Sequence, residues 1–259
     1  MARLRNLAQM VQNAQKNSVA DSFVNDLIYT VEQYNKTDYT PSQSFKPSGI
    51  SGCERSLYYE LKGVKPDKES NGYELAGICE SGTDRHDTIQ QYVMGMEKYG
   101  IDCKWLDVAQ YLHDANIKDP VVVKQVGNET KLHSIKYNMN FMCDGLIEYK
   151  GEKYILEIKT ESTHKFNMHN EPWPGHIQQA TCYSMTLGID KVIFLYENRD
   201  CCTKKAFLVT VTQSMIQRIE DIINRVNKAV DTNVIPPRCE DCKKCNYCKY
   251  KTQCKKDGV

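Results

Sequence analysis

The segment Lys153–Lys159 reads Lys-Tyr-Ile-Leu-Glu-Ile-Lys, which is a run of strand-forming residues interrupted by two opposite charges. Successive side chains of a strand point to opposite faces. The even-numbered positions therefore form one apolar face, while Glu157 and Lys159 lie with Ile155 on the other. Charged groups inside an apolar strand are costly unless each has a partner. The segment predicts a sheet strand that carries a polar site on one face.

A second acidic residue is expected beside this strand. Asp144 lies in the segment Tyr137–Tyr149, a predicted strand that a short turn joins to Lys153–Lys159. A hairpin would bring Asp144 alongside Glu157. Two carboxylates on neighbouring strands provide the oxygen ligands that Mg²⁺ or Mn²⁺ prefers. A lysine at the same point can orient an attacking water or stabilise charge on a phosphate, which indicates phosphodiester hydrolysis. The alternative is an ordinary strand end beside a surface Glu–Lys pair.

The remaining pattern predicts a mixed α/β domain. Apolar spacing predicts two successive helical patterns in residues 1–40 and a helix that starts near residue 51. It also predicts helices over 76–98, 175–187 and 214–230. Further strands are expected at 192–196 and 206–211. Ser214 and Gln217 have the spacing of a capping box at the start of the last long helix.

Composition limits the class of protein. The chain of 259 residues is 41% hydrophobic and 26% charged, as in ordinary globular domains. Its net charge is +1, so nucleic-acid binding would require a local basic patch. No apolar run is long enough to cross a bilayer, and no apolar segment follows the first residues as in a secretory signal. We therefore expect a cytoplasmic protein without a membrane partner.

Twelve cysteines are present, and five of them fall between Cys239 and Cys254. Regular two-residue spacing in a long chain without a signal indicates metal or cluster ligation in a reducing compartment, rather than disulfides. Three thiols, in Cys245-x2-Cys248-x5-Cys254, require a fourth ligand. The thiols suit either an iron–sulfur cluster or tetrahedral zinc. A local zinc site would use Cys239, Cys242, Cys245 and Cys248. The other cysteines are interpreted as small buried apolar residues.

The C-terminal residues 236–259 form a candidate DNA-binding patch. Basic side chains outnumber acidic ones there by seven to three, and Tyr247 and Tyr250 lie among them. Such a patch suits a single strand, through phosphate contacts and base stacking. A solubilising tail around a cluster is the equally weighted alternative. Arg55, Lys249, Lys251 and Tyr247 are the candidate contacts, although Arg55 could equally bind backbone.

Four motifs in order resemble the RecB-like branch of the PD-(D/E)XK nuclease superfamily, over roughly residues 48–254. They are Gly82-x3-His86, Asp144 in Cys-Asp-Gly, Glu157-Ile-Lys159 and Gln179-x3-Tyr183. The resemblance implies a restriction-endonuclease-like core with a central mixed sheet flanked by helices. It implies metal ligation by His86, Asp144, Glu157 and the Ile158 carbonyl. Gln179 and Tyr183, one helical turn apart, would position Lys159 or the substrate phosphate.

One subgroup of these nucleases includes the AddB nuclease domain and the CRISPR-associated RecB-like adaptation nucleases. Members carry a Cys before an Arg and an aromatic pair, as in Cys53-Glu-Arg55-Ser-Leu-Tyr58-Tyr59 here. The resemblance implies a 4Fe–4S cluster held by Cys53, Cys245, Cys248 and Cys254, with zinc as the alternative. Such ligation closes a loop of about 200 residues and restricts the unfolded chain.

Together these features predict an N-terminal helical segment (1–47), a nuclease core (48–235) and a cysteine-rich tail (236–259) that closes onto Cys53. The expected activity is Mg²⁺- or Mn²⁺-dependent hydrolysis of DNA, with an exonuclease on duplex ends or single strands favoured over an endonuclease. A helicase or recombination protein would be a fitting partner. The alternatives are an inactive nuclease fold that serves as a DNA-binding or scaffold subunit, and a zinc module without catalysis.

Overall fold

The structure, a computed structural model, describes residues 2–36, 40–67, 72–240, 245–246 and 248–258, with side chains from residue 18 onwards. The chain divides into two compact units, Met1–Asp38 with Lys68–Ser81, and Tyr39–Asp67 with Gly82–Val259. The first unit holds α1 (Ala2–Tyr34) and the start of α3 (Tyr73–Met94). The two predicted N-terminal helical patterns are one helix, because the sequence has no Gly or Pro to interrupt α1.

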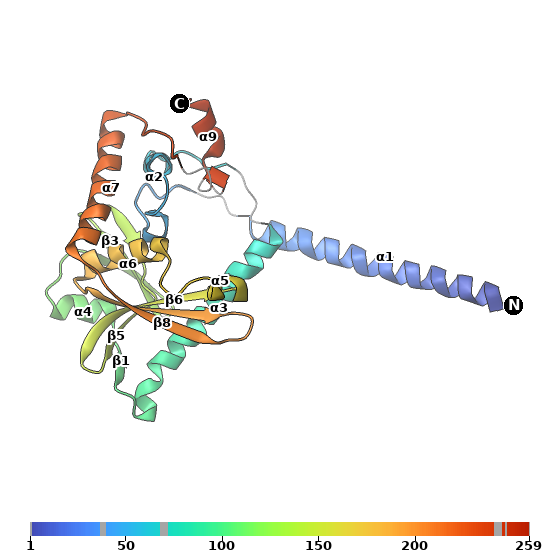
Figure 1. Ribbon diagram of the computed structural model, residues 1–259. Helices are drawn as coiled ribbons and strands as arrows, with labels where there is room; N and C mark the ends of the chain where they lie inside the picture. The colour runs from blue at the N-terminus through green and yellow to red at the C-terminus, as the bar shows by residue number, and fades with distance from the viewer. Residues whose placement is uncertain (1, 37–39, 68–71, 241–244, 247, 259) are drawn as a thin grey trace. The chain divides into compact units, whose positions relative to one another are not determined.

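A five-stranded mixed sheet forms the centre of the second unit (Figure 1). Its strands are β1 (Cys103–Trp105), β5 (Gly145–Tyr149), β6 (Glu152–Glu161), β7 (Lys191–Asn198) and β8 (Lys204–Thr210), in that order across the sheet. Strands β6 and β7 are parallel, whereas the other pairs are antiparallel. The parallel pair needs a crossover, which α6 (Pro174–Leu187) provides. The prediction of an α/β fold with a mixed sheet flanked by helices is confirmed.

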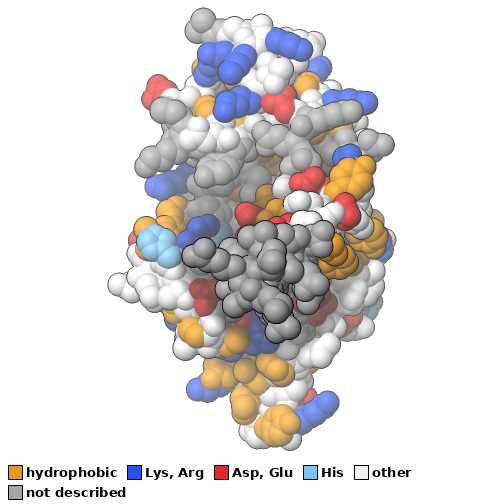
Figure 2. Space-filling view, turned by 90° about the vertical axis from the view of Figure 1, so that its right-hand side faces the viewer, with side chains coloured by type: hydrophobic (Ala, Val, Ile, Leu, Met, Phe, Trp, Pro, Cys, Tyr) orange, Lys and Arg blue, Asp and Glu red, His pale blue; other side chains and the backbone are white. Residues whose placement is uncertain are grey.

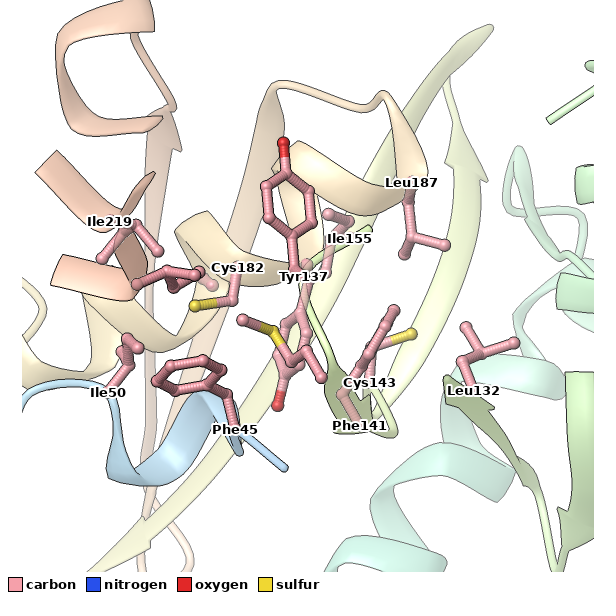
Figure 3. Packing of buried hydrophobic residues seen from close by; sticks show 14 of the residues in the cluster. Phe45, Ile50, Leu132, Tyr137, Phe141, Cys143, Ile155, Cys182, Leu187 and Ile219 are labelled. Carbon is pink, nitrogen blue, oxygen red and sulfur yellow. The ribbon is translucent and has the colours of Figure 1, made fainter. Parts of the chain in front are cut away.

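Helices pack on both faces of this sheet, and the alternation of β6 determines which residues meet them. Ile155 belongs to the larger core with residues of α6 and α7 (Gln213–Thr232), among them Cys182, Leu187 and Ile219 (Figure 3). Leu156 and Ile158 belong to a second core with residues of α3. Glu157 and Lys159 therefore lie on the face that α6 covers.

A second, three-stranded sheet was not predicted. It consists of β2 (Val121–Val126), β3 (Glu129–Ser134) and β4 (Met139–Phe141) in consecutive order. The predicted strand Tyr137–Tyr149 was wrong as a single element, since its two halves are β4 and β5 of different sheets. The break falls at Met142–Asp144. It allows the Asp144 side chain, instead of its backbone, to bond to β6.

The other helices are short apart from α7. They are η1 (Pro47–Gly49), α2 (Glu54–Leu61), η2 (Met96–Tyr99), α4 (Val108–Asp114), α5 (Thr163–Asn167) and α9 (Lys251–Lys256). The predicted capping box at Ser214 and Gln217 was wrong. Helix α7 begins one residue earlier, and the hydroxyl of its N-cap Thr212 accepts a bond from the Met215 N–H. Within the described ranges, no helix has the length and apolar character that a bilayer crossing demands.

Candidate functional site

Asp144, Glu157 and Lys159 converge on the face of β6 that α6 covers. Gly145 pairs with Leu156 in the β5–β6 ladder, which brings Asp144 next to Glu157. The Ile158 N–H donates to Asp144 Oδ2 over 2.6 Å. Lys159 Nζ lies 2.6 Å from Glu157 Oε1. The structure thus brings together the two acids and the ammonium group that the sequence singled out.

Glu157 is fully buried, and its environment is unusual for a carboxylate. Among the described residues, neither of its oxygens has a partner in hydrogen-bond geometry, although the Lys159 ammonium lies within ion-pair distance of one. Burial raises the pKa of Glu157, and the neighbouring Asp144 raises it further. Buried carboxylate oxygens without hydrogen bonds are rare in native proteins, and a bound ion would satisfy them. This donor set fits a hard divalent cation.

Lys159 is held in its charged form by these acids. Burial alone would lower the pKa of Lys159, but the charges of Glu157 and Asp144 outweigh it and raise the pKa. Its ammonium also donates to Gln179 Oε1 over 3.3 Å, and Gln179 Nε2 donates to the Tyr183 hydroxyl over 2.7 Å. Both residues lie on α6, and Tyr183 is buried against Phe141. The helix therefore fixes the position of Lys159 through a chain of side-chain contacts.

His86 reaches the site from α3. Its Nδ1 lies 3.6 Å from Asp144 Oδ1. Burial lowers the pKa of His86, but its contact with Asp144 more than offsets this and raises it. The predicted ligand Ile158 lies between Glu157 and Lys159, and its amide is the group that bonds to Asp144; the role of its carbonyl stays a prediction. Within the part of the chain that the structure describes, no three acidic, His or Cys side chains are already arranged as a metal site.

Two polar residues near Asp144 were missed by the sequence reasoning. Gln90 of α3 is fully buried, and its amide donates to the Asp144 carbonyl over 2.7 Å and to Glu129 Oε1 over 3.0 Å. Burial raises the pKa of Glu129, as does the charge of Asp144, so a third carboxyl group lies near the predicted pair. No local signal marks Glu129, because it opens β3, a strand that the sequence pattern did not reveal.

An ion pair between α3 and β7 fixes the helix that carries His86. Both Nε and Nη2 of Arg85 bond to the two carboxylate oxygens of Glu197, the latter over 2.9 Å. Glu197 is fully buried, and Lys204 Nζ lies 2.7 Å from its Oε2. Two-pronged arginine–carboxylate bonds are strong and directional. Arg85 immediately precedes His86, so this pair anchors to β7 the turn of α3 that carries His86.

Cys53 is the N-cap of α2, and Arg55 of the same helix donates to Cys254 Sγ over 3.6 Å, so two of the predicted cluster cysteines lie where the tail meets α2. Burial raises the pKa of the Cys248 thiol, and interaction with Cys53, Cys245 and Cys254 raises it further. Within the described residues, no three of these thiols are arranged as a metal site. The donor set suits iron–sulfur or zinc chemistry equally. Cys242, which belongs to the alternative local zinc site, lies outside the described residues.

The C-terminal tail packs on α2 through buried polar contacts. Arg55 is buried; its Nε donates to the Pro236 carbonyl over 2.6 Å, and Nη1 donates to the Gly258 carbonyl over 3.0 Å and to Cys254 Sγ over 3.6 Å. These contacts show the backbone binding that the sequence left open for Arg55, and its phosphate contact stays a prediction. Lys249 Nζ bonds to buried Glu60 over 2.6 Å. Lys251 is exposed on α9, and Tyr247 lies outside the described residues.

No protein-family model and no curated protein matches this chain. Among solved structures, SSO0001 is 14% identical, with a TM-score of 0.45 over 92% of this chain and 98% of that one. The alkaline exonuclease LHK-Exo of Laribacter hongkongensis is 13% identical, with a TM-score of 0.44 over 74% of this chain and 90% of that one. LHK-Exo in complex with dAMP is 14% identical, with a TM-score of 0.44 over 74% and 89%. Likeness at this level concerns chain arrangement and carries no information on activity.

Proposed function

We propose that this protein is a divalent-metal-dependent nuclease that hydrolyses DNA phosphodiesters. The observation that carries the proposal is the fully buried Glu157 carboxylate. Among the described residues its oxygens have no partner in hydrogen-bond geometry, while Asp144 lies beside it and the Lys159 ammonium lies 2.6 Å from Oε1. A purely structural carboxylate at this depth would be hydrogen-bonded. A ligand to Mg²⁺ or Mn²⁺ would instead keep its oxygens available.

Each residue has a distinct role in this proposal. Asp144, Glu157, His86 and the Ile158 carbonyl would hold the ion. The bound ion would lower the pKa of a coordinated water and polarise the phosphoryl oxygen. The Lys159 ammonium orients the attacking water or stabilises charge that develops on the phosphate. Gln179 and Tyr183 keep that ammonium in place, since Gln179 accepts from Lys159 and donates to the Tyr183 hydroxyl.

We further propose exonuclease action on duplex ends or single strands, with a helicase or recombination protein as a partner. This finer assignment rests on the resemblance to RecB-like nucleases and on the basic tail. Helix α9 carries exposed Lys251, Lys255 and Lys256. Figure 2 shows several Lys and Arg side chains at the top of the view, the level at which Figure 1 has α9. Such side chains can contact the phosphates of a strand.

We also propose that Cys53, Cys245, Cys248 and Cys254 hold a 4Fe–4S cluster, with zinc as the alternative. Cys53 is the N-cap of α2, and the other three cysteines lie in the tail, whose backbone accepts hydrogen bonds from Arg55 of that helix. A cluster there would hold the tail on α2, away from the proposed hydrolytic residues. Anaerobic purification followed by iron, sulfide and zinc analysis distinguishes the two.

The decisive experiment is digestion of end-labelled single- and double-stranded DNA with Mg²⁺, with Mn²⁺ and with a chelator. Wild type should cleave only with a divalent ion, and the Asp144→Ala variant should be inactive. Equal cleavage by the two proteins would overturn the proposed mechanism. End-labelled products also distinguish stepwise release of nucleotides from internal cuts, because the first gives short labelled products from one end.

A further inference from the structure

A hollow of about 370 Å³ lies in the loop that joins α5 to α6. It is lined by Met168, His169, Asn170, Glu171, Pro172, Trp173 and Pro174. None of these residues belongs to the predicted site. Cavities that bind small ligands begin at about 300 Å³, so the hollow has room for one nucleoside-sized group.

The hollow is connected to the proposed hydrolytic site through β6. Glu157, Lys159 and Glu161 occupy alternate positions of this strand and so share one face. Glu161 therefore follows Lys159 by roughly 7 Å along the strand, and its carboxylate bonds to two residues that line the hollow. The step is comparable to the length of one nucleotide. A strand with its phosphate at Lys159 would have a neighbouring base at the hollow.

The walls of the hollow are held rigidly. Glu161 is buried, and its Oε1 accepts from Trp173 Nε1 over 2.8 Å, while its Oε2 lies 2.8 Å from His169 Nε2. His169 Nδ1 lies 2.6 Å from the Glu171 carbonyl. Lys205 Nζ donates to the His169 carbonyl over 2.7 Å and also bonds to the Phe166 carbonyl. A loop tied to two strands in this way keeps its shape without a ligand.

The lining favours a base over a phosphate. It contains no Lys or Arg, and the Glu171 carboxylate would repel an anion. Trp173 is half-buried, and Met168 is 61% exposed. An aromatic ring and an exposed thioether provide apolar surfaces for a planar base. Asn170 adds an amide that can donate or accept at the base edge.

We propose that this hollow binds the nucleobase that adjoins the scissile phosphate. The inference rests on the proposed nuclease function, since it assigns the hollow to that enzyme's substrate. It makes the 168–174 loop a substrate-binding element of the enzyme. Stacking tolerates any base, so the hollow would recognise an unpaired nucleotide rather than a sequence.

Tryptophan fluorescence tests the proposal directly, because the chain has only Trp105 and Trp173. Oligodeoxythymidylate is titrated, with a chelator present, into wild type and into Trp173→Phe. A second titration uses an oligonucleotide of the same length and charge that lacks bases. We expect oligodeoxythymidylate to quench the fluorescence of wild type and to quench that of Trp173→Phe less. The baseless strand should quench neither protein. Equal quenching by the baseless strand would overturn the assignment to a base.

A variant pair provides an independent measurement. Met168→Ala should weaken oligodeoxythymidylate binding about 5-fold, through the loss of one sulfur–base contact. The matched control is Leu208→Ala on β8, since both side chains are 61% exposed and apolar. If Met168→Ala keeps the wild-type affinity and Trp173 is not quenched, the hollow does not bind a base. That result would leave the proposal of metal-dependent cleavage intact. Conversely, quenching by a wild type that never cleaves DNA would refute the nuclease proposal but not base binding.

Discussion

The Lys159 ammonium lies 2.6 Å from a Glu157 carboxylate that is fully buried. The two residues are two positions apart on β6, so the strand's alternation alone puts them on one face. Buried ion pairs contribute little net stability, because desolvation offsets their attraction. Within the described residues, the Glu157 oxygens have no partner in hydrogen-bond geometry, which favours a role of this pair in chemistry over one in folding. Substitution of each residue therefore tests its role in catalysis or metal binding.

Replacement of the ammonium should affect turnover more than folding. Lys159→Met keeps the length of the side chain and removes the charge that would stabilise the phosphate. Loss of one such group typically lowers kcat by about 100- to 1,000-fold. Cleavage of end-labelled DNA at saturating Mn²⁺ measures the effect. Lys153→Met, on an exposed position of the same strand, should retain wild-type turnover. Similar rates in both variants would remove Lys159 from the mechanism.

Glu157 should couple metal binding to stability. Saturating Mn²⁺ at about 100 times its Kd would stabilise wild type by about 2.7 kcal/mol, because only the folded state binds. Glu157→Gln removes the charged ligand, so its Tm should not change on addition of Mn²⁺. Thermal unfolding with the ion and with a chelator measures both proteins. The control is Glu152→Gln on an exposed position of β6, which should retain the Mn²⁺ shift. A full shift in Glu157→Gln contradicts the ligand assignment.

Several features of this site could be predicted because they are local in the sequence. The alternation of β6 places Glu157 and Lys159 together, and the helical spacing of Gln179 and Tyr183 places them on one face of α6. Each relation depends on residues four or fewer apart. The hairpin that brings Asp144 to Glu157 is nearly as local, since β5 and β6 are consecutive strands.

Other features could not be predicted, because distant pairings create them. All of β2 is exposed, so its run Val121–Val123 lacks the burial that its apolar character suggests. Buried Gln90 of α3 links Glu129 to the Asp144 carbonyl, and these three residues are far apart in the sequence. Trp105 packs over Gly145 so closely that no Cβ fits there, and nothing in the local sequence announces that contact. These relations depend on tertiary packing, which overrides local propensity.

The free energy of unfolding should fall at low pH because of His176. Burial, together with the nearby Lys159 charge, lowers the pKa of His176 from 6.5 to about 4. The unfolded chain therefore takes up a proton that the folded protein rejects. The stabilisation is complete above pH 6.5 and is lost as the pH falls towards 4. At pH 5 the loss should be at most about 2 kcal/mol, since one pKa unit corresponds to about 1.4 kcal/mol and partial exposure reduces the effect.

Urea unfolding at pH 7.5 and pH 5 measures this contribution. Asparagine at position 176 has no titrating group, so the His176→Asn variant should lose less stability between the two pH values than wild type. His164→Asn is the control, because that histidine is exposed on α5. An identical pH dependence in wild type and His176→Asn would show that His176 does not contribute.

The Arg85–Glu197 pair should affect Mn²⁺ affinity although neither residue is a proposed metal ligand. Arg85→Met removes the two bonds that orient α3, while Lys204 still pairs with Glu197 and limits the cost of its buried charge. Groups that orient metal ligands typically change metal affinity by about 10- to 100-fold when mutated. Mn²⁺ titration should show that loss, and Arg85→Lys should recover only part of it, since lysine cannot make the two-pronged contact. Weakened stability with unchanged Mn²⁺ affinity would leave the pair a purely structural role.

Cys53 should be required for iron or zinc to bind to the C-terminal tail, although Cys53 lies far from the tail in the sequence. It precedes α2, and the charges of Cys53, Cys245 and Cys254 all act on Cys248. If these four thiols hold the cluster, Cys53→Ser loses most of the iron and sulfide that anaerobically purified wild type contains. It also loses the stability gained by closing a loop of about 200 residues, of the order of 5 kcal/mol. Cys201→Ser, at an exposed turn, should retain wild-type metal content. Full metal content in Cys53→Ser, with loss in Cys239→Ser, would instead identify the local zinc site as correct, because only that arrangement draws all its ligands from the tail.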